Sequence, residues 1–549
     1  MSIKSGLTIL FLTASAAAQA QRATPRSNDT VLKGSTIEVI QSYKPKVKQT
    51  PKPEWIPQLP PADTTHPAFS YDVPQQALNY TYNSQPLRPL ALGRAADPLP
   101  FPNYVKLGGG NLSTIFADAG IGGLHGDNYE SAIHLHHLSQ KGTVKNQQSS
   151  LSGIEAEGTL HQAAGEWHAS VAAARNQYNY YGYDHVFYDY PKDSVRQVYT
   201  TIRAIVDMAG KPDSSSRFSY HPTVNASLYN ARYKTSEVSA GFDAPVSYRI
   251  DSFLDLSVAL NGNITNYKTG SASIANNFIQ VMPGVAVHKN RFTGHGLAGF
   301  GLGKGSAGYI LPDVLATYTI PDDKLAFSLG YQSKLRQNTY EQLTTENPYM
   351  ISTYNVLQGR RDEAFFEVRG SAGSHLSFTG RASWWNMANL PSFLNDTGDQ
   401  KQMYVWYQDV KAISVQLGAR YHVANTWSAG IAGDFYSFYN IKDQSNTLES
   451  YVWHQPSMRI KGDVMVHVGR KLIASAYVSV LGGIHARDIN YNVVALRTIS
   501  DVGLNGEYQI IKRLSAFVQI SNLLNNKYER WLGYQAYGLN IYGGIRLKF

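Results

Sequence analysis

Residues 103–549 carry a period-two alternation of apolar and polar side chains, which is the strongest constraint on the fold. In the last segment one face is apolar: Leu539, Ile541, Ile545, Leu547 and Phe549. The same alternation runs through 254–264, 325–332 and 514–521. Successive side chains of a strand point to opposite faces of its sheet. The pattern therefore predicts strands with lipid on one face and a wet lumen on the other.

The connections between these segments alternate between short and long. Short turns are predicted near 249–252, 321–324, 373–375, 424–426, 469–471 and 512–513, and long loops at 181–196, 336–358, 387–402, 441–456 and 525–538. Short turns at one end and long loops at the other are typical of outer-membrane barrels. We therefore predict an all-β fold, a transmembrane antiparallel barrel of about 22 strands.

Composition supports the barrel and excludes several other classes. Charged residues make up 16% of the 549-residue chain, below the usual soluble average of roughly 25%. The chain has no cysteine, which excludes disulfides, cysteine-ligated metals and thiol catalysis. The net charge is +9 without a basic run interleaved with aromatic residues, so no nucleic-acid partner is expected.

The first twenty residues resemble a secretory signal peptide. Lys4 provides the positive start, an apolar run covers 7–12, and Ala18 to Ala20 form a small-x-small cleavage pattern. We expect Sec export, cleavage near Ala20, and residence in the bacterial outer membrane. An apolar stretch long enough for a membrane helix is not found elsewhere in the sequence.

Residues 21–102 differ from the rest because prolines crowd them, from Pro45 to Pro102. Proline fixes φ and removes a backbone donor, so helices and ladders stay short. We predict an extended Pro-rich periplasmic arm, or a reduced plug, in front of the barrel at 103–549. One short strand is expected within the arm, and its residues are Thr36, Ile37, Glu38, Val39 and Ile40.

The C-terminal end resembles a known family. Residues 521–529 (SNLLNNKYE) followed by 538–549 are similar to the last two strands of TonB-dependent outer-membrane receptors. The resemblance implies a terminal signal for the barrel-assembly machinery, formed by Tyr542, Ile545, Leu547 and Phe549. It also implies that residues 36–40 act as a TonB box; the alternative is a strand that pairs with another periplasmic edge.

The chain departs from this family in front of the barrel. Such receptors carry a globular plug of well over a hundred residues, whereas only 21–102 precede the barrel here. The resemblance favours ligand uptake across the outer membrane. The missing plug favours a non-transporting accessory subunit of an assembly or secretion complex. The expected partners are outer-membrane lipid and lipopolysaccharide, the assembly machinery, and either TonB or other subunits. The lumen is expected to be filled by the arm, by inward-folded loops or by a partner chain.

One long loop is densely aromatic. It contains Tyr180, Tyr181, Tyr183, Phe187, Tyr188 and Tyr190. Such rings suit either an interfacial girdle or an extracellular contact platform for a glycan or partner.

Candidate chemical motifs have simpler explanations. Gly299 to Ser306 imitates a phosphate loop, but its glycines recur at period two, as on a strand face. His134 and His136 share a strand face without an adjacent acidic partner in the sequence, which favours a polar lumen pair over a metal site. A third catalytic partner for Asp184 and His185 cannot be placed. We therefore expect neither a cofactor nor enzymatic activity.

Overall fold

The computed structural model describes residues 103–549 except 127, 164, 211–215, 305–307, 321–323, 399 and 424–425. The predicted signal peptide (1–20), the arm (21–102) and its strand at 36–40 lie outside the described residues. The signal peptide and the arm therefore stay predictions.

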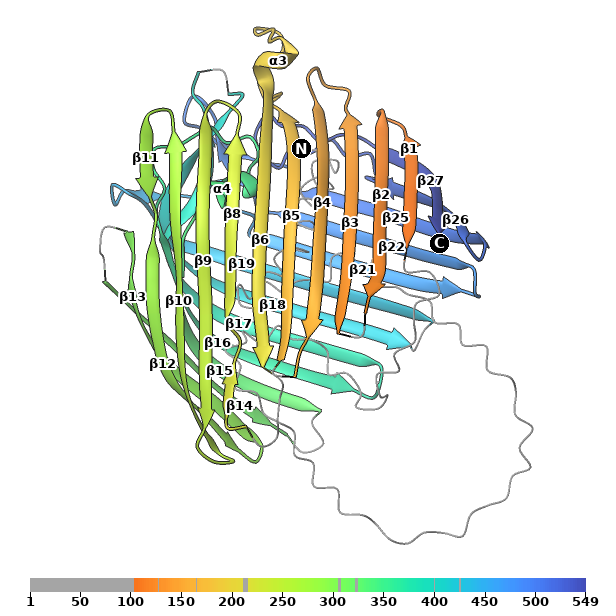
Figure 1. Cartoon of the computed structure of the whole chain (residues 1–549). Helices are drawn as coiled ribbons and strands as arrows, with labels where there is room; N and C mark the ends of the chain where they lie inside the picture. Colours follow the sequence, from red (N-terminus) through yellow and green to blue (C-terminus); the bar gives the residue numbers. More distant parts are fainter. Residues whose placement is uncertain are drawn as a thin grey trace, which may run out of the picture.

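The described chain is a single barrel wall of 22 long strands (Figure 1). These strands are β1 (Tyr104–Gly110), β2 (Thr114–His125), β3 (Tyr129–Lys141), β4 (Gln148–His161), β5 (Gly165–Asn179), β6 (Arg196–Gly210), β8 (Thr223–Ala231), β9 (Thr235–Arg249), β10 (Leu254–Thr269), β12 (Phe278–Lys289), β13 (Phe292–Leu302), β14 (Gly308–Thr319), β15 (Leu325–Arg336), β16 (Gly359–Ala372), β17 (Leu376–Asn395), β18 (Met403–Val423), β19 (Trp427–Asp443), β21 (Met458–Val468), β22 (Leu472–Gly482), β25 (Ile499–Ile511), β26 (Leu514–Ser521) and β27 (Asn540–Lys548).

Shorter elements decorate this wall. They are β7 (Phe218–Tyr220), which pairs with β9, β11 (Ala272–Ala275), β20 (Leu448–Glu449), the separate hairpin of β23 (His485–Arg487) and β24 (Val493–Ala495), and the helices α3 (Lys192–Val195) and α4 (Tyr340–Glu346). Neither helix has the length that crossing a bilayer requires, and the described residues contain no other candidate.

Antiparallel pairing closes the wall. Each long strand pairs with the next along the chain, and β1 pairs with β27 through the register Tyr104↔Lys548 to Gly110↔Tyr542. Closure matters because an open edge in hydrocarbon would leave backbone groups unpaired, at several kcal/mol each. The predicted fold class and strand number are confirmed.

The two faces of the wall differ as the alternation predicted. On β10, Leu256, Val258 and Ile264 are exposed on the outer face, whereas Asp255 and Ala259 are buried on the inner face. Because the outer residues are apolar on strand after strand, the barrel presents a lipid-compatible exterior.

Most predicted turns and loops lie where expected, with one correction. We predicted a loop at 387–402, but β17 continues to Asn395 and the connection to β18 spans only 396–402. β17 continues past this point because a bulge between Met387 and Leu390 shifts its register with β18, and Asn389 in the bulge has a φ of 52°. A bulge bends its strand, and Phe393 in the strand end beyond it joins a packed layer at the barrel mouth.

Candidate functional site: the loop layer across the barrel mouth

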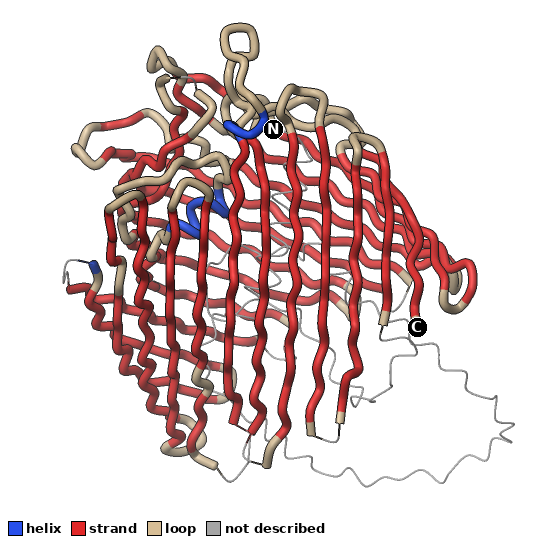
Figure 2. Tube along the Cα trace, turned by 45° about the horizontal axis from the view of Figure 1, so that its top comes forward, coloured by secondary structure: helices blue, strands red, loops and turns tan. Residues whose placement is uncertain are grey.

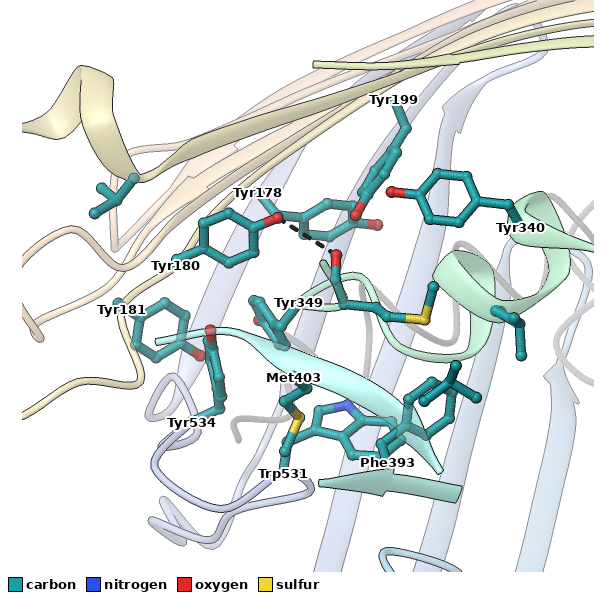
Figure 3. Close-up of a cluster of buried hydrophobic side chains, with 14 of the residues drawn as sticks. Tyr178, Tyr180, Tyr181, Tyr199, Tyr340, Tyr349, Phe393, Met403, Trp531 and Tyr534 are labelled. Carbon is teal, nitrogen blue, oxygen red and sulfur yellow. Dashed lines mark hydrogen bonds between the residues drawn. The ribbon is translucent and has the colours of Figure 1, made fainter. Parts of the chain in front are cut away.

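The connections at one end of the barrel fold inward and pack together. We call this packed group the loop layer. Its buried members are Leu151, Tyr178, Tyr180, Tyr181, Tyr183, Val195, Tyr199, Tyr229, Tyr267, Tyr340, Leu343, Tyr349, Met350, Val356, Phe393, Met403, Val405, Tyr407, Trp531 and Tyr534. They come from several loops and from strand ends around the wall, so the layer ties distant parts of the mouth together (Figure 3).

The centre of the loop layer is residues 337–358, which we call the inserted loop. It joins β15 to β16, contains α4, and lies inside the barrel at the end with the long connections (Figures 1 and 2). Thr339 caps α4 by accepting a hydrogen bond from the Gln342 backbone at 3.2 Å. The apolar side of α4, Tyr340 and Leu343, is buried in the layer.

The wall holds the start of the inserted loop through charged contacts. Both carboxylate oxygens of Glu237 on β9 accept from α4, from the Tyr340 N–H at 2.7 Å and the Glu341 N–H at 3.2 Å. The Glu341 carboxylate in turn accepts from Arg203 at 2.5 Å and Ser227 at 2.7 Å. A buried carboxylate needs such donors to offset the loss of water, so these contacts fix α4 against β6, β8 and β9.

The other side of the inserted loop is held by backbone pairing. The Ile351 N–H donates to the Met403 carbonyl at 2.8 Å, and the Met403 N–H donates to the Tyr349 carbonyl at 3.0 Å. These bonds form an isolated parallel bridge between Met350 and Met403. The inserted loop is therefore anchored both to β6–β9 and to β18, across the mouth.

Aromatic rings fill the space between these anchors. Tyr349 stacks on Tyr534 with 3.6 Å between ring centroids, and Tyr181 meets both rings edge-on at 5.9 and 5.0 Å. The Tyr180 hydroxyl reaches the Met350 carbonyl at 3.5 Å (Figure 3). Burial raises the pKa of Tyr180 and Tyr349 well above the ordinary range, so the phenols in this layer stay neutral.

A second group of contacts fastens two further loops to the layer. His454 is fully buried and donates from Nδ1 to the Phe393 carbonyl at 2.7 Å, while its Nε2 accepts from the Leu532 N–H at 3.1 Å. Arg530 donates to the His454 carbonyl. Burial lowers the pKa of His454 to about 3, and the Arg530 charge acts in the same direction. His454 is therefore a neutral link between the end of β17 and the two connections that contain His454 and Leu532.

The predicted aromatic loop is divided between the interior and the surface. Tyr180, Tyr181 and Tyr183 are buried in the loop layer, whereas Phe187 is 80% exposed and Tyr188 is 39% exposed. Tyr190 is partly buried and packs on Tyr183 with ring centroids 4.9 Å apart. Tyr180, Tyr181 and Tyr183 are therefore structural. The prediction of a contact surface remains for Phe187 and Tyr188.

The predicted terminal signal lies on both faces of β27. Ile545, Leu547 and Phe549 are exposed on the outer face at about half of their surface. Tyr542 is buried on the inner face, where its ring lies 5.5 Å from Phe116. Recognition of these residues by the assembly machinery stays a prediction.

The motifs set aside earlier have structural explanations. Gly299 and Gly301 lie on β13, where a Cβ on Gly299 would approach the Leu311 carbonyl at 2.8 Å. His134 and His136 stack at 5.8 Å, and Asp118 on the neighbouring strand contacts His134 at 2.9 Å. We missed this acidic partner because cross-strand register is not visible in the sequence. The described residues contain no group of three or more metal-ligating side chains.

Sequence reasoning also missed the main parts of the loop layer. The length of the 336–358 connection was recognised, but not its inward course or the roles of Tyr340, Tyr349 and Glu237. The available signal was the presence of two large rings in a long connection, Tyr340 and Tyr349, both of which are buried. Large aromatic rings in a connection favour a course in which the rings are buried.

Comparison with solved structures identifies proteins of similar fold. The FrpB iron transporter from Neisseria meningitidis (F3-3 variant) aligns with a TM-score of 0.63 at 11% identity, covering 81% of each chain. The siderophore receptor PiuA from Acinetobacter baumannii aligns at 0.58 and 9% identity, covering 81% of this chain and 82% of its own. The ferric yersiniabactin uptake receptor FyuA from Yersinia pestis aligns at 0.56 and 11% identity, covering 81% of this chain and 80% of its own.

These identities are low, so the likeness is one of fold. No protein-family model matches the chain, and no curated protein matches it. The chain has the 22-strand barrel of TonB-dependent outer-membrane receptors, and the resemblance predicted from the C-terminal residues is confirmed at this level. A closed barrel with an apolar exterior is the architecture of bacterial outer-membrane proteins.

Proposed function

We propose that the protein is an outer-membrane uptake receptor in which the loop layer controls access to the lumen. The observation that carries this proposal is the inserted loop, which is anchored on opposite sides of the mouth and packed with buried rings. Long connections face the exterior in outer-membrane barrels. A ligand arriving from outside therefore meets the loop layer first, and uptake requires the layer to open.

The proposal includes TonB as the partner that supplies energy, through residues 36–40. Its support is the similarity of these residues to a TonB box and the receptor fold of the barrel. The proposed role is uptake without enzymatic activity, and its support is the fold likeness to proteins described as transporters and receptors.

The test is binding of the full-length protein to the purified periplasmic domain of TonB. We expect binding by the natural chain and its loss in Val39→Pro, because proline cannot donate to a pairing strand. Val493→Pro, on the β24 hairpin within a long connection at the other end of the barrel, is the matched control and should bind normally. Equal binding of Val39→Pro and the natural chain would contradict the TonB-box assignment.

A second function is favoured by the loop tips. Val186 and Phe187 are 87% and 80% exposed, and Leu448 and Tyr491 are also exposed. Exposed apolar side chains at loop tips suit contact with another protein. If the protein is an accessory subunit, gently solubilised membranes should yield it in fixed ratio with a second outer-membrane protein. Phe187→Ser should weaken that co-purification.

A further inference from the structure

The charges on the inner face of the barrel are divided by side. We call the inner faces of β2 to β14 the acidic wall and those of β15 to β27 together with β1 the basic wall. By strand alternation, the acidic wall carries Asp118, Glu130, Glu155, Glu157, Glu166, Asp207, Glu237, Asp243, Asp255 and Asp313, with Arg203 and Arg249 as its arginines. The basic wall carries Lys106, Lys334, Arg336, Arg361, Arg369, Arg381, Arg420, Arg459, Lys461, Arg546 and Lys548.

Many carboxylates of the acidic wall have histidine partners in place of arginines or lysines. Asp207 contacts His168 at 3.1 Å and His221 at 3.2 Å, and Asp118 contacts His134 at 2.9 Å. Further along the wall, His288 lies 3.3 Å from Asp255, and His295 lies 3.3 Å from Asp313.

The two arginines of the acidic wall do not balance its ten carboxylates. Arg203 is engaged with Glu341 of the inserted loop at 2.5 Å, and Arg249 lies 3.6 Å from Asp255. The basic wall also carries carboxylates, which are fewer than its eleven basic side chains: Glu363, Glu367, Asp434, Asp463, Asp501 and Glu507. Some of them are paired with arginines, as in Arg381–Glu363 at 2.8 Å and Arg420–Asp463 at 2.8 Å. The lumen is therefore negative on one side and positive on the other.

Two carboxylates of the acidic wall lie at the same level of the barrel. Asp207 pairs in register with Thr223, and Thr223 pairs with Asp243. Asp207 and Asp243 are thus separated by one intervening strand, or roughly 9–10 Å. Two carboxylates at this separation, within a wall that carries eight more, suit an extended cationic chain better than a compact cation.

We propose that residues 44–52 of this chain dock on the acidic wall. This segment, KPKVKQTPK, contains Lys44, Lys46, Lys48 and Lys52 and no acidic residue. Its prolines favour an extended backbone. In an extended chain alternate residues share a face, so Lys44, Lys46 and Lys48 present three ammonium groups to one surface.

The position of the segment along the chain allows this contact. The chain enters the wall at Tyr104, beside β2, which is the first strand of the acidic wall. Residues 53–102 lie between the lysines and this entry, and a chain of that length spans at most roughly 165–180 Å. The proposal goes beyond uptake, since it assigns the lumen an occupant whether or not a ligand is carried.

Paired cysteines can test the contact cleanly because the natural chain has none. Lys46→Cys is combined in full-length protein with Asn261→Cys, which lies beside Asp243 on the acidic wall. The matched control combines Lys46→Cys with Ser475→Cys, a half-buried polar residue of the basic wall. Native outer membranes are treated with a short bis-maleimide, and linked peptides are identified by mass spectrometry.

We expect a 46–261 link in most molecules and little 46–475 link. Asp207→Asn with Asp243→Asn should lower the yield of the 46–261 link severalfold, and high salt should act in the same direction. Heat-modifiable migration on gels reports that each variant has formed its barrel.

Three results would overturn the proposal. One is equal linking to residues 261 and 475, and another is single alkylation of both cysteines without a link in an assembled barrel. The third is a link from residue 46 to a different protein, which would place the segment on a partner chain.

Discussion

His454 shows how one neutral side chain can join several loops. Both ring nitrogens are used, and the ring is fully buried beside Arg530. An imidazole with an ordinary pKa near 6.5 gains a proton easily in water, but a protonated ring would lose its acceptor for the Leu532 N–H. The loop layer thus depends on a protonation state that burial enforces.

We predict that acidification loosens the loop layer through His454. The pKa is lowered to about 3 in the packed layer, so the opened layer binds the proton more tightly. The stabilisation is complete above about pH 6.5 and declines as the pH falls toward 3, by up to about 1.4 kcal/mol per pH unit.

Amide hydrogen exchange in residues 527–537 between pH 7.5 and 4.5, corrected for intrinsic rates, measures this effect. His454→Gln should have lower protection at neutral pH and a flatter pH profile. His375 lies in a turn at the opposite end of the barrel, and His375→Gln should keep the natural profile. The same pH profile in His454→Gln would refute the assignment.

Glu237 provides a second prediction at this scale. Its carboxylate accepts from two N–H groups at the start of α4, so Glu237→Ala should destabilise the local fold of α4 by about 1–2 kcal/mol. Faster amide exchange confined to residues 340–346 is the expected result. Glu166→Ala, in an exposed position at the start of β5, serves as control, and an unchanged α4 in Glu237→Ala would contradict the capping role.

At the scale of elements, the long strands were predictable because alternation is a local property of the sequence. The β17 extension was not, because residues 387–395 form a strand only with a bulge and with packing from distant loops. The same limit applied to Tyr180, Tyr181 and Tyr183. Their burial depends on Tyr349 and Tyr534, far along the chain, and periodicity does not report such contacts.

The inserted loop carries a prediction of its own. Replacing residues 340–346 by a short Gly-Ser linker removes α4, its buried rings and its contacts to Glu237. We expect the natural protein to show little conductance in planar bilayers and the variant to show severalfold larger, longer openings.

A matched replacement in the exposed loop tip at 185–189 should leave the conductance unchanged. If the α4 replacement also conducts no more than the natural chain, the loop layer is not what closes the lumen. Large stable conductance of the natural protein would likewise contradict a closed mouth.

At the scale of the whole molecule, the seam between β1 and β27 is unusually tight. Gly108 and Gly544 face each other across it, and a Cβ on Gly544 would lie 1.8 Å from the Leu107 carbonyl. We predict that Gly544→Leu lowers the yield of closed barrel strongly, measured as the heat-modifiable fraction in outer membranes. Gly506→Leu is the control, since a Cβ there meets only Val518 at 3.7 Å. Equal yields would show that the seam tolerates side chains.

The barrel can close only when both β1 and β27 are present. The backbone of Ile541 is bonded to the side chain of Asn111, a separation of 430 residues. β1 and β27 each lack their second neighbouring strand until nearly the whole polypeptide has been exported. An incomplete barrel therefore has two unpaired strand edges, which can pair with strands of other chains. The unpaired edges must therefore be protected until export is complete. A truncated chain should be degraded by proteases and should not form a smaller pore.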